Sequence, residues 1–319
     1  MTRTASWLLS VGMLLFVALL ASRGLPAIFS SLKLAGWGLV LIALFHLLPL
    51  VLDAYAIRVL FVEIASSGRF WDSLLSRWIG ESANSLMPGG QLGGPVLMAR
   101  HLLSRGMPMR DAAAAITVST TLQSIAQIAF ALVGVAMLGA HSARTSSLIA
   151  SGVLALQIGG FYLLQRRGLF SRLMRTLSRV SGKRDWSSLL IHAAAIDAAV
   201  VDTYGRSGAV AGSFLLSLIG WIVGTGEVYF ILQLLQSPVS WGDAFILESL
   251  GQAIRGAAFA IPGALGVQEG GYLLLAPLTG LTSEVALALS LSKRAREVIL
   301  GLPGLLYLHW SPGSGAVRK

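Results

Sequence analysis

The chain has 319 residues, of which 55% are hydrophobic and 12% are charged, and its formal net charge is +10. Soluble domains carry about 25% charged residues, so this composition excludes an ordinary soluble protein and predicts an all-α integral membrane protein. The chain has no cysteine, which excludes disulfides and thiolate metal sites; the positive charge favours basic cytoplasmic loops beside anionic lipid over nucleic-acid binding.

The first part of the chain predicts two apolar spans and then a broken segment. Ala5–Ala21 favours an uncleaved helix over a signal peptide, because no small-residue cleavage pattern follows it. Leu34–Leu52 is charge-free and long enough to span; a lone histidine such as His46 within it is more often structural than functional. Glu81–Gly94 reads ESANSLMPGGQLGG, is interrupted by proline and glycine, and is followed by the apolar stretch Pro95–Leu103.

The middle of the chain contains two further apolar stretches and the strongest charge run. Ala112–Ala143 carries no Asp, Glu, Lys or Arg, and spacings of three and four place most of the polar residues in its first half on one helical face, namely Thr117, Thr120, Thr121, Ser124 and Gln127. Such a stripe either packs against other helices or lines a polar cavity. Thr145–Gln165 is another span. Arg166–Arg184 interleaves arginines with apolar residues, which favours an amphipathic helix on the cytoplasmic face.

The last part of the chain repeats the earlier order of elements. Ser207–Trp241 predicts a span with a single charge, Glu227, after a weakly apolar stretch without a clear assignment. Glu248–Gly271, ESLGQAIRGAAFAIPGALGVQEGG, is a second broken segment. Like the first, it begins Glu-Ser, reaches Pro-Gly and ends in Gly-Gly. Leu281–Trp310 has the length of one tilted span, and Lys293 and Glu297 in its middle are spaced to pair on one helical face.

Broken segments at matching places in two halves indicate a transporter-type inverted repeat. We expect one membrane domain over 1–319, with a first repeat at 34–143, a connecting helix and basic linker at 144–206, and a second repeat at 207–310. It would contain about six full transmembrane helices and two re-entrant hairpins. The positive-inside rule then places both termini and the basic linker in the cytoplasm, and the hairpins enter from opposite sides.

Charged and amide side chains within apolar segments are the candidates for function. An unpaired ion at mid-bilayer costs from about 2.5 kcal/mol upward, so the intramembrane glutamates should face the arginines and lysine of the second half. These groups form either a structural ion-pair network or a polar substrate site. As candidate substrate-binding residues we take Glu81, Asn84, Gln91, Glu227, Glu248, Gln252, Arg255, Gln268, Glu269, Lys293, Arg294 and Arg296.

Proline and glycine in the broken segments suggest half-helices inside the membrane. Their free N–H groups could hold a lipid headgroup, although glycines also serve close helix packing. The residues concerned are Pro88, Gly89, Gly90, Pro262, Gly263, Gly266 and Gly270. The sequence has no recognised nucleophile, metal-binding or nucleotide-binding motif, and its five histidines show no ligand spacing. We therefore expect no enzyme activity, cofactor or metal.

Three stretches carry a resemblance to a known family: RWIGESANSLMPGGQLGG, GQAIRGAAFAIPGALGVQEGGY and ALALSLSKRAREVILGLPGLLYL. They resemble the flippase-like superfamily that includes the transmembrane region of lysylphosphatidylglycerol synthases, and within it the hopanoid-biosynthesis-associated inner-membrane family of hopanoid transporters. Pro95 stands where that family often has an acidic residue, so the resemblance assigns site roles mainly to the second broken segment and to Arg294 and Arg296.

The resemblance implies a multi-pass protein of the bacterial inner membrane that transports a polar-headed lipid. An extended hopanoid is the expected cargo, and membrane lipids, hopanoid or anionic phospholipid, are the expected partners. The alternative is a membrane-integral enzyme or accessory subunit that modifies a phospholipid, a hopanoid or a polyprenyl carrier, because paired carboxylates can perform acid–base chemistry.

Overall fold

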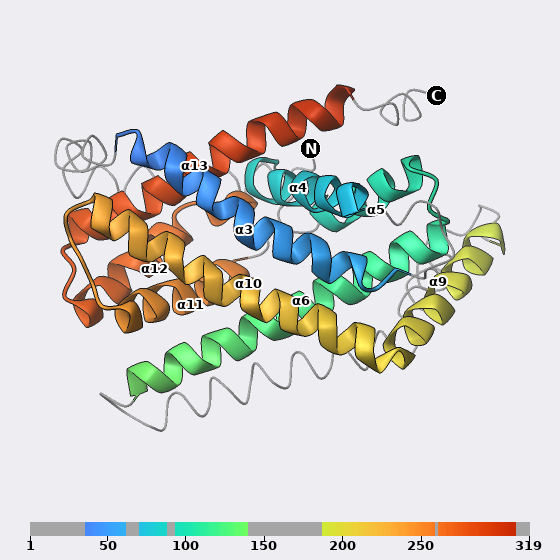
Figure 1. Cartoon of the computed structure of the whole chain (residues 1–319), viewed down its shortest axis with the longest axis horizontal. Coiled ribbons are helices and arrows are strands. Elements are labelled where there is room, and N and C mark those ends of the chain that lie inside the picture. Colours follow the sequence, from blue (N-terminus) through green and yellow to red (C-terminus); the bar gives the residue numbers. More distant parts are fainter. Residues whose placement is uncertain (1–35, 62–69, 88–92, 140–186, 259–260, 311–319) are drawn as a thin grey trace.

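A computed structural model describes residues 36–61, 70–87, 93–139, 187–258 and 261–310, and every element in these ranges is helical (Figure 1). The α-helices are α3 (Gly38–Arg58), α4 (Phe70–Leu86), α5 (Gly93–Ser104), α6 (Met109–Gly139), α9 (Ser187–Gly205), α10 (Ser207–Leu234), α11 (Trp241–Ala257), α12 (Val267–Leu275) and α13 (Ser283–Trp310). Two short 3-10 turns, η2 (Pro262–Ala264) and η3 (Ala276–Thr279), flank α12.

Three of the described helices, α3, α6 and α10, are long and apolar enough to cross a membrane. They correspond to the predicted spans at Leu34–Leu52, Ala112–Ala143 and Ser207–Trp241, so the prediction of an all-α membrane protein is confirmed. The predicted segments Ala5–Ala21, Thr145–Gln165 and Arg166–Arg184 lie outside the described residues.

Helix α13 has the length of a membrane span but not the composition of a lipid-facing one. Lys293, Arg296 and Glu297 in its middle are buried in the protein. The helix packs against α3, α4, α10 and α12. Its charges therefore face protein groups rather than lipid, which is where intramembrane charges are tolerated.

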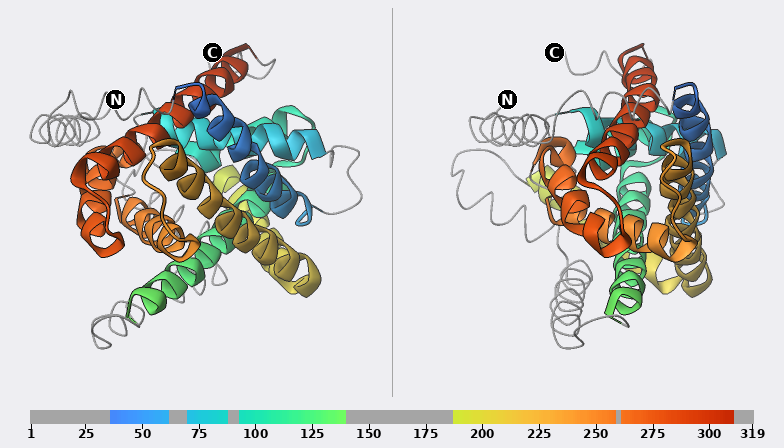
Figure 2. Two further views of the ribbon diagram at one scale, coloured as in Figure 1. Left: turned by 60° about the vertical axis from the view of Figure 1, so that its left-hand side comes forward. Right: turned by 90° about the vertical axis from the view of Figure 1, so that its left-hand side faces the viewer.

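Helix packing follows the same plan in the first and second halves of the chain. Helices α3 and α10 lie side by side, across the middle of the view in Figure 1 and at one edge of the molecule in the right-hand view of Figure 2. Around this pair, α3 packs against α4 as α10 packs against α11, and α4 packs against α5 as α11 packs against α12. Likewise α4 contacts α13 as α11 contacts α6, and α3 contacts α13 as α10 contacts α6. Each of these packings thus has a counterpart in the other half.

The backbones of α3 and α10 approach closely because α10 carries glycine where it contacts α3. A Cβ atom at Gly226 would lie 2.7 Å from the Phe45 ring. Small residues allow helix backbones to approach one another within a membrane. Apolar residues of α3, α10, α11, α12 and α13 then form the largest buried cluster, which includes Ile42, Ile231, Leu247 and Tyr272.

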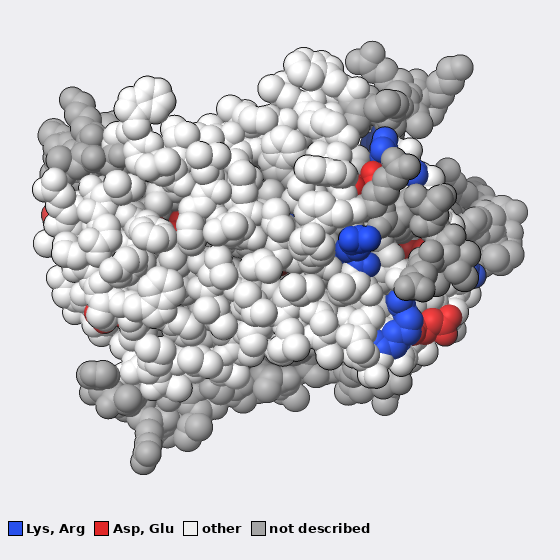
Figure 3. Space-filling model, viewed as in Figure 1, with Lys and Arg blue, Asp and Glu red and all other residues white. Residues whose placement is uncertain are grey.

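Charge is unevenly distributed over the surface. In Figure 3 the basic residues visible on this face gather at one end, near the start of α6 and α9, whereas a broad region beside them is almost uncharged. The junction between α5 and α6 at this end carries Arg105 and Arg110, whose side chains are 48% and 66% exposed. An uncharged region that ends in exposed arginines is the surface expected of a bilayer-embedded protein.

Candidate functional site

A polar cavity of about 240 Å³ lies at the centre of the helices, lined by residues of α3, α4, α5, α6, α10, α11 and α13. Its charged lining groups are Asp53, Arg77, Glu81, Glu227, Glu248, Arg255, Arg296 and Glu297, accompanied by His46. Hydroxyl and amide groups complete the polar lining, namely Asn84, Ser85, Thr120, Gln123, Ser124, Gln127 and Gln252. Both halves of the chain therefore contribute polar groups to one space.

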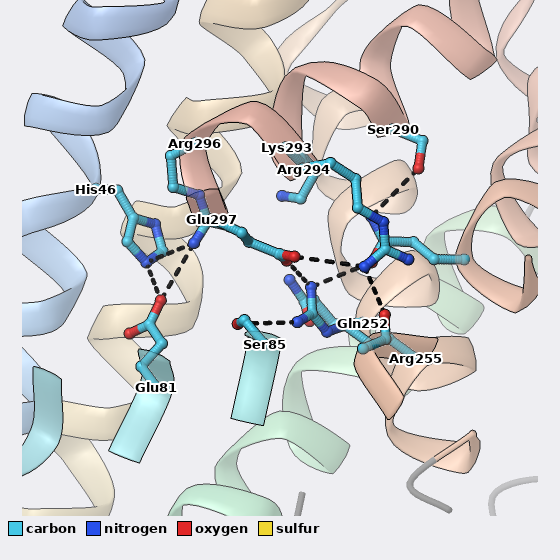
Figure 4. A network of polar contacts seen from close by, with 12 residues as sticks. His46, Glu81, Ser85, Gln252, Arg255, Ser290, Lys293, Arg294, Arg296 and Glu297 are labelled. Carbon is cyan, nitrogen blue, oxygen red and sulfur yellow. Dashed lines mark hydrogen bonds and ion pairs between the residues drawn. The ribbon is translucent and has the colours of Figure 1, made fainter. Parts of the chain in front are cut away.

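His46 joins the two halves at this cavity. Its Nδ1 atom lies 2.7 Å from Oε2 of Glu227 on α10, and its Nε2 atom lies 2.7 Å from Oε1 of Glu81 on α4. Arg296 on α13 reaches the same place, with Nη1 3.1 Å from Oε1 of Glu81 and Nε 3.3 Å from Oε1 of Glu227 (Figure 4). The sequence interpretation treated His46 as structural, although an ionisable residue in an apolar helix is itself a signal of function.

Lys293 forms the most deeply buried ion pairs of the site. Its Nζ atom lies 2.7 Å from Oε2 of Glu248 and 3.4 Å from Oε1 of Glu227, and all three side chains are at most 3% exposed. The expected pairing of Lys293 with Glu297 along α13 is therefore wrong. The lysine points toward α10 and α11, where two buried carboxylates need a cation, whereas Glu297 is paired with Arg255 and Arg294.

Arg255 and Arg294 share the carboxylate of Glu297. Arg255 Nη1 donates to Glu297 Oε1, and Arg294 Nη1 lies 3.4 Å from Glu297 Oε2. Arg255 also donates to Gln268 at 3.1 Å. Arg294 and Arg296 extend in opposite directions from α13 (Figure 4). Arg296 binds Glu81 of the first broken segment and Arg294 binds Glu269 of the second, so α13 contacts both. The predicted proximity of the glutamates, Arg255 and the α13 cluster is thereby confirmed.

Glu269 is an internal cap of α12 rather than a cavity group. Its Oε2 accepts a hydrogen bond of 2.7 Å from the backbone N–H of Gly266, and Oε1 accepts from Ser290 and from Arg294 Nε at 3.1 Å each. A carboxylate at a helix N-terminus satisfies N–H groups that would otherwise have no partner. The carboxylate is completely buried and is absent from the cavity lining.

The second broken segment differs in detail from the predicted half-helix. Pro262 and Gly263 lie in η2, and α12 begins four residues later, at Val267. The backbone N–H of Gly266 at the start of α12 donates to Glu269. The carboxylate thus takes the place that was expected for a lipid headgroup. Gly263 has a φ of 60°, and a Cβ atom there would lie 3.0 Å from the carbonyl oxygen of Ser85. The two broken segments meet at this point, since Ser85 lies on α4.

Two groups of cavity residues come from the first half. Asp53 Oδ2 lies 2.7 Å from Arg77 Nη2 and accepts from Gln123 Nε2 at 2.7 Å. The polar stripe of α6 also reaches the cavity, through Thr120, Ser124 and Gln127. The three-and-four spacing had indicated this stripe. Asp53 and Arg77 were missed because each lies near the end of an apolar stretch, where charges usually meet water.

The predicted site residues fall into three sets. Those that line the cavity are Glu81, Asn84, Glu227, Glu248, Gln252, Arg255 and Arg296. Those that form a layer behind it are Gln268, Glu269, Lys293 and Arg294, which bind the lining residues or one another. Those outside the described residues are Pro88, Gly89, Gly90 and Gln91. Gly266 and Gly270 share the backbone hydrogen bond that begins α12.

This arrangement suits recognition of a polar, hydrogen-bonding group inside a membrane protein. Most of the ionic groups are already paired, so the cavity presents compensated charges together with amides and hydroxyls. Two buried guanidinium nitrogens, Nε of Arg77 and Nη2 of Arg294, have no hydrogen-bond partner in the described residues. Of these arginines, only Arg77 lines the cavity.

Comparison with known proteins identifies one family. The family model of the lysylphosphatidylglycerol synthase TM region matches residues 4–304. Comparisons with curated proteins and with solved structures found no match.

Proposed function

Since this chain belongs to the lysylphosphatidylglycerol synthase TM region family, we propose that it translocates a polar-headed lipid across or out of a bacterial inner membrane. The observation that carries the proposal is the polar cavity of about 240 Å³ at the centre of a strongly apolar helical protein. Its amides, hydroxyls and paired charges are suited to a hydroxyl- or amine-bearing headgroup, while the lipid body remains among apolar helix faces.

We propose an extended hopanoid as the cargo, on the resemblance of the two broken segments to hopanoid-associated membrane proteins. The cavity is of a size to hold a headgroup and not the ring system, so the rings would stay in the bilayer. A phospholipid or polyprenyl headgroup would meet the same hydrogen-bonding groups. The cargo must therefore be identified by experiment.

The transport mechanism that we propose is alternating access by an inverted repeat with two re-entrant hairpins and about six full spans. The matched packing of the two halves around α3 and α10 supports this mechanism. So does the meeting of the two broken segments at Gly263 and Ser85. In such transporters the site lies between the repeats, and one repeat rocks against the other. The basic end near the start of α6 would face the cytoplasm.

The deciding experiment measures the hopanoid content of inner and outer membrane fractions and compares cells that carry the gene with cells from which it is deleted. The proposal predicts that hopanoids accumulate in the inner membrane when the gene is deleted, and that the intact gene restores their distribution. A gene variant carrying Glu248→Gln, which removes one cavity carboxylate, should restore it poorly. An unchanged hopanoid distribution with an altered phospholipid pool would show that the cargo is a phospholipid and not a hopanoid. The proposed transport function would still hold.

We also propose that the protein does not alter its lipid covalently. The purified chain is to be incubated with isotope-labelled hopanoid and phospholipid, and the lipids analysed by mass spectrometry. Recovery of unchanged lipid is expected. A covalently changed product would favour the alternative, a membrane enzyme that uses the buried carboxylates.

A further inference from the structure

The imidazole of His46 is held between two carboxylates, and this geometry requires a proton. Both ring nitrogens lie 2.7 Å from a carboxylate oxygen, Nδ1 from Glu227 and Nε2 from Glu81. A neutral imidazole has one N–H and one lone pair, and an ionised carboxylate only accepts hydrogen bonds. With both glutamates ionised and the ring neutral, one of the two contacts would join two lone pairs.

We propose that His46, Glu81 and Glu227 form a proton-binding site, and that this proton is the coupling ion of the lipid translocation proposed above, on which the coupling role rests. Glu227 is already paired with both Lys293 and Arg296, so Glu81 is the glutamate suited to hold the proton, and two placements follow. Either His46 is an imidazolium that donates to both carboxylates, or Glu81 is protonated and donates to Nε2. In both cases the proton lies between Nε2 of His46 and Oε1 of Glu81.

The contact with Arg296 agrees with a proton at this position. Nη1 of Arg296 lies 3.1 Å from Nε2 of His46 and 3.1 Å from Oε1 of Glu81. A guanidinium only donates, and Oε1 of Glu81 can accept from it in both placements, because a protonated carboxyl oxygen keeps a lone pair. Nε2 accepts from Arg296 in neither placement, since it carries the proton in one and accepts it from Glu81 in the other. Arg296 therefore has an acceptor in each placement, and the proton can move between the two atoms without breaking the cluster.

The charge balance of the buried cluster also favours one additional proton. Among the described residues, the ion pairs around α13 involve the cations Arg255, Lys293, Arg294 and Arg296 and the carboxylates Glu81, Glu227, Glu248, Glu269 and Glu297. These are four positive and five negative groups. A net charge is costly in a low-dielectric interior, and one bound proton brings the sum to zero.

The other charged groups that line the cavity are paired. From α3 itself, Asp53 faces the cavity and is paired with Arg77 of α4. From α11, Glu248 is paired with Lys293 of α13, and Arg255 with Glu297 of α13. The lining groups of α6 are hydroxyls and amides, without charge. His46 and its two glutamates are therefore the place where a proton changes the balance.

The site lies across elements that would move during alternating access. His46 is on α3, Glu81 on α4 and Glu227 on α10, so the proton is held by two carboxylates only while α4 and α10 both lie against α3. Separation of either helix removes one carboxylate and weakens proton binding. All three residues also line the cavity, which gives the proton a path to water and to an entering headgroup.

The first test detects the proton itself and does not depend on transport. The chain is labelled with ¹⁵N-histidine and reconstituted in lipid nanodiscs at pH 8, where a free histidine is largely neutral. His46→Gln identifies the His46 signals. A doubly protonated His46 ring, or an infrared band of a protonated carboxyl that disappears in Glu81→Gln, supports the proposal. A neutral ring together with no such band overturns it. His309→Gln, on the last turn of α13, is the control and should change neither feature.

The second test measures coupling in liposomes that carry a trace of NBD-labelled phosphatidylethanolamine, with the membrane potential held at zero by potassium and valinomycin. For one proton per lipid, a gradient of one pH unit should shift the distribution of the probe between leaflets by about tenfold, because each pH unit is a tenfold proton ratio. His46→Gln should abolish this shift, whereas His309→Gln should retain it.

The results of the second test separate the two proposals. Translocation by the wild-type chain that ignores the pH gradient overturns the coupling role and leaves lipid transport standing. Absence of translocation of both this probe and a labelled extended hopanoid removes both the transport function and the coupling role. The spectra of the first test still decide whether the proton site exists.

Discussion

The ammonium of Lys293 on α13 lies 2.7 Å from the carboxylate of Glu248 on α11, and the two side chains are only 1% and 3% exposed. Glu227 on α10 lies 3.4 Å from the same ammonium. One cation therefore compensates two carboxylates from different helices. Three helices are held together by a contact that lipid could not replace.

Removing Lys293 should be strongly destabilising. In Lys293→Met the two carboxylates remain buried without their ammonium, and breaking a buried ion pair from one side costs about 3–5 kcal/mol. Thermal unfolding of the purified chain in detergent should show a large fall in melting temperature. The double variant Lys293→Met with Glu248→Met should recover part of the loss. Arg110→Met, which breaks an exposed pair, is the control and should change stability by less than about 1 kcal/mol.

Glu269→Gln should impair folding as well as transport. The carboxylate accepts from the Gly266 N–H, from Ser290 and from Arg294, and an amide cannot replace all three acceptor contacts. A loss of about 1–3 kcal/mol is expected for buried donors left without partners. The yield of folded protein and the translocation rate should fall together. A normal yield with lost transport would show that Glu269 acts on substrate directly.

Gly263→Ala should be more harmful than the same change at another glycine of positive φ. Gly263 has a φ of 60°, and an added Cβ would lie 3.0 Å from the Ser85 carbonyl oxygen. Gly106 has a φ of 92° but no atom within 4 Å of such a Cβ. Both variants carry backbone strain of about 1–2 kcal/mol, so the difference between their melting temperatures reports the crowding of Gly263 against the Ser85 carbonyl and against Arg294 Nη1, which lies 3.3 Å from the added Cβ. Equal shifts would mean that this contact contributes little.

Filling the cavity should block transport without unfolding the protein. Ser124 of α6 lines the cavity, and within the described residues its hydroxyl donates to the Thr120 carbonyl of the same helix. Ser124→Leu places a larger side chain in the space proposed for the headgroup, and translocation in liposomes should fall at least tenfold. Val133→Leu enlarges a side chain on an exposed face of the same helix and should leave the rate unchanged. Full activity of Ser124→Leu would place the lipid path elsewhere.

Cysteine labelling can test the proposed orientation, because the chain contains no cysteine of its own. Arg110→Cys, at the basic end, should be protected from an impermeant maleimide in intact cells. Ser237→Cys, between α10 and α11 at the opposite end, should react. The reverse pattern would invert the orientation and with it the direction proposed for the two broken segments.

The membrane class and the main helices could be predicted from sequence because they depend on local composition. Long apolar runs with very few charges, as in α3, α6 and α10, require a lipid or protein interior regardless of what packs beside them. The repeated Glu-Ser, Pro-Gly and Gly-Gly order is likewise a local pattern, and it indicated the second broken segment as a candidate site. The cost of an isolated charge predicted that Glu248, Arg255 and the α13 cluster would meet.

The choice of partners was decided by the tertiary structure alone. Spacing along α13 suggested that Lys293 would pair with Glu297, but the lysine binds Glu248 and Glu227, because helices distant in sequence bring two carboxylates to it. His46 offered no pattern that distinguished it from a structural histidine until α4 and α10 placed a carboxylate at each ring nitrogen. Composition determines which segments leave water, whereas helix packing determines which buried charges must compensate one another.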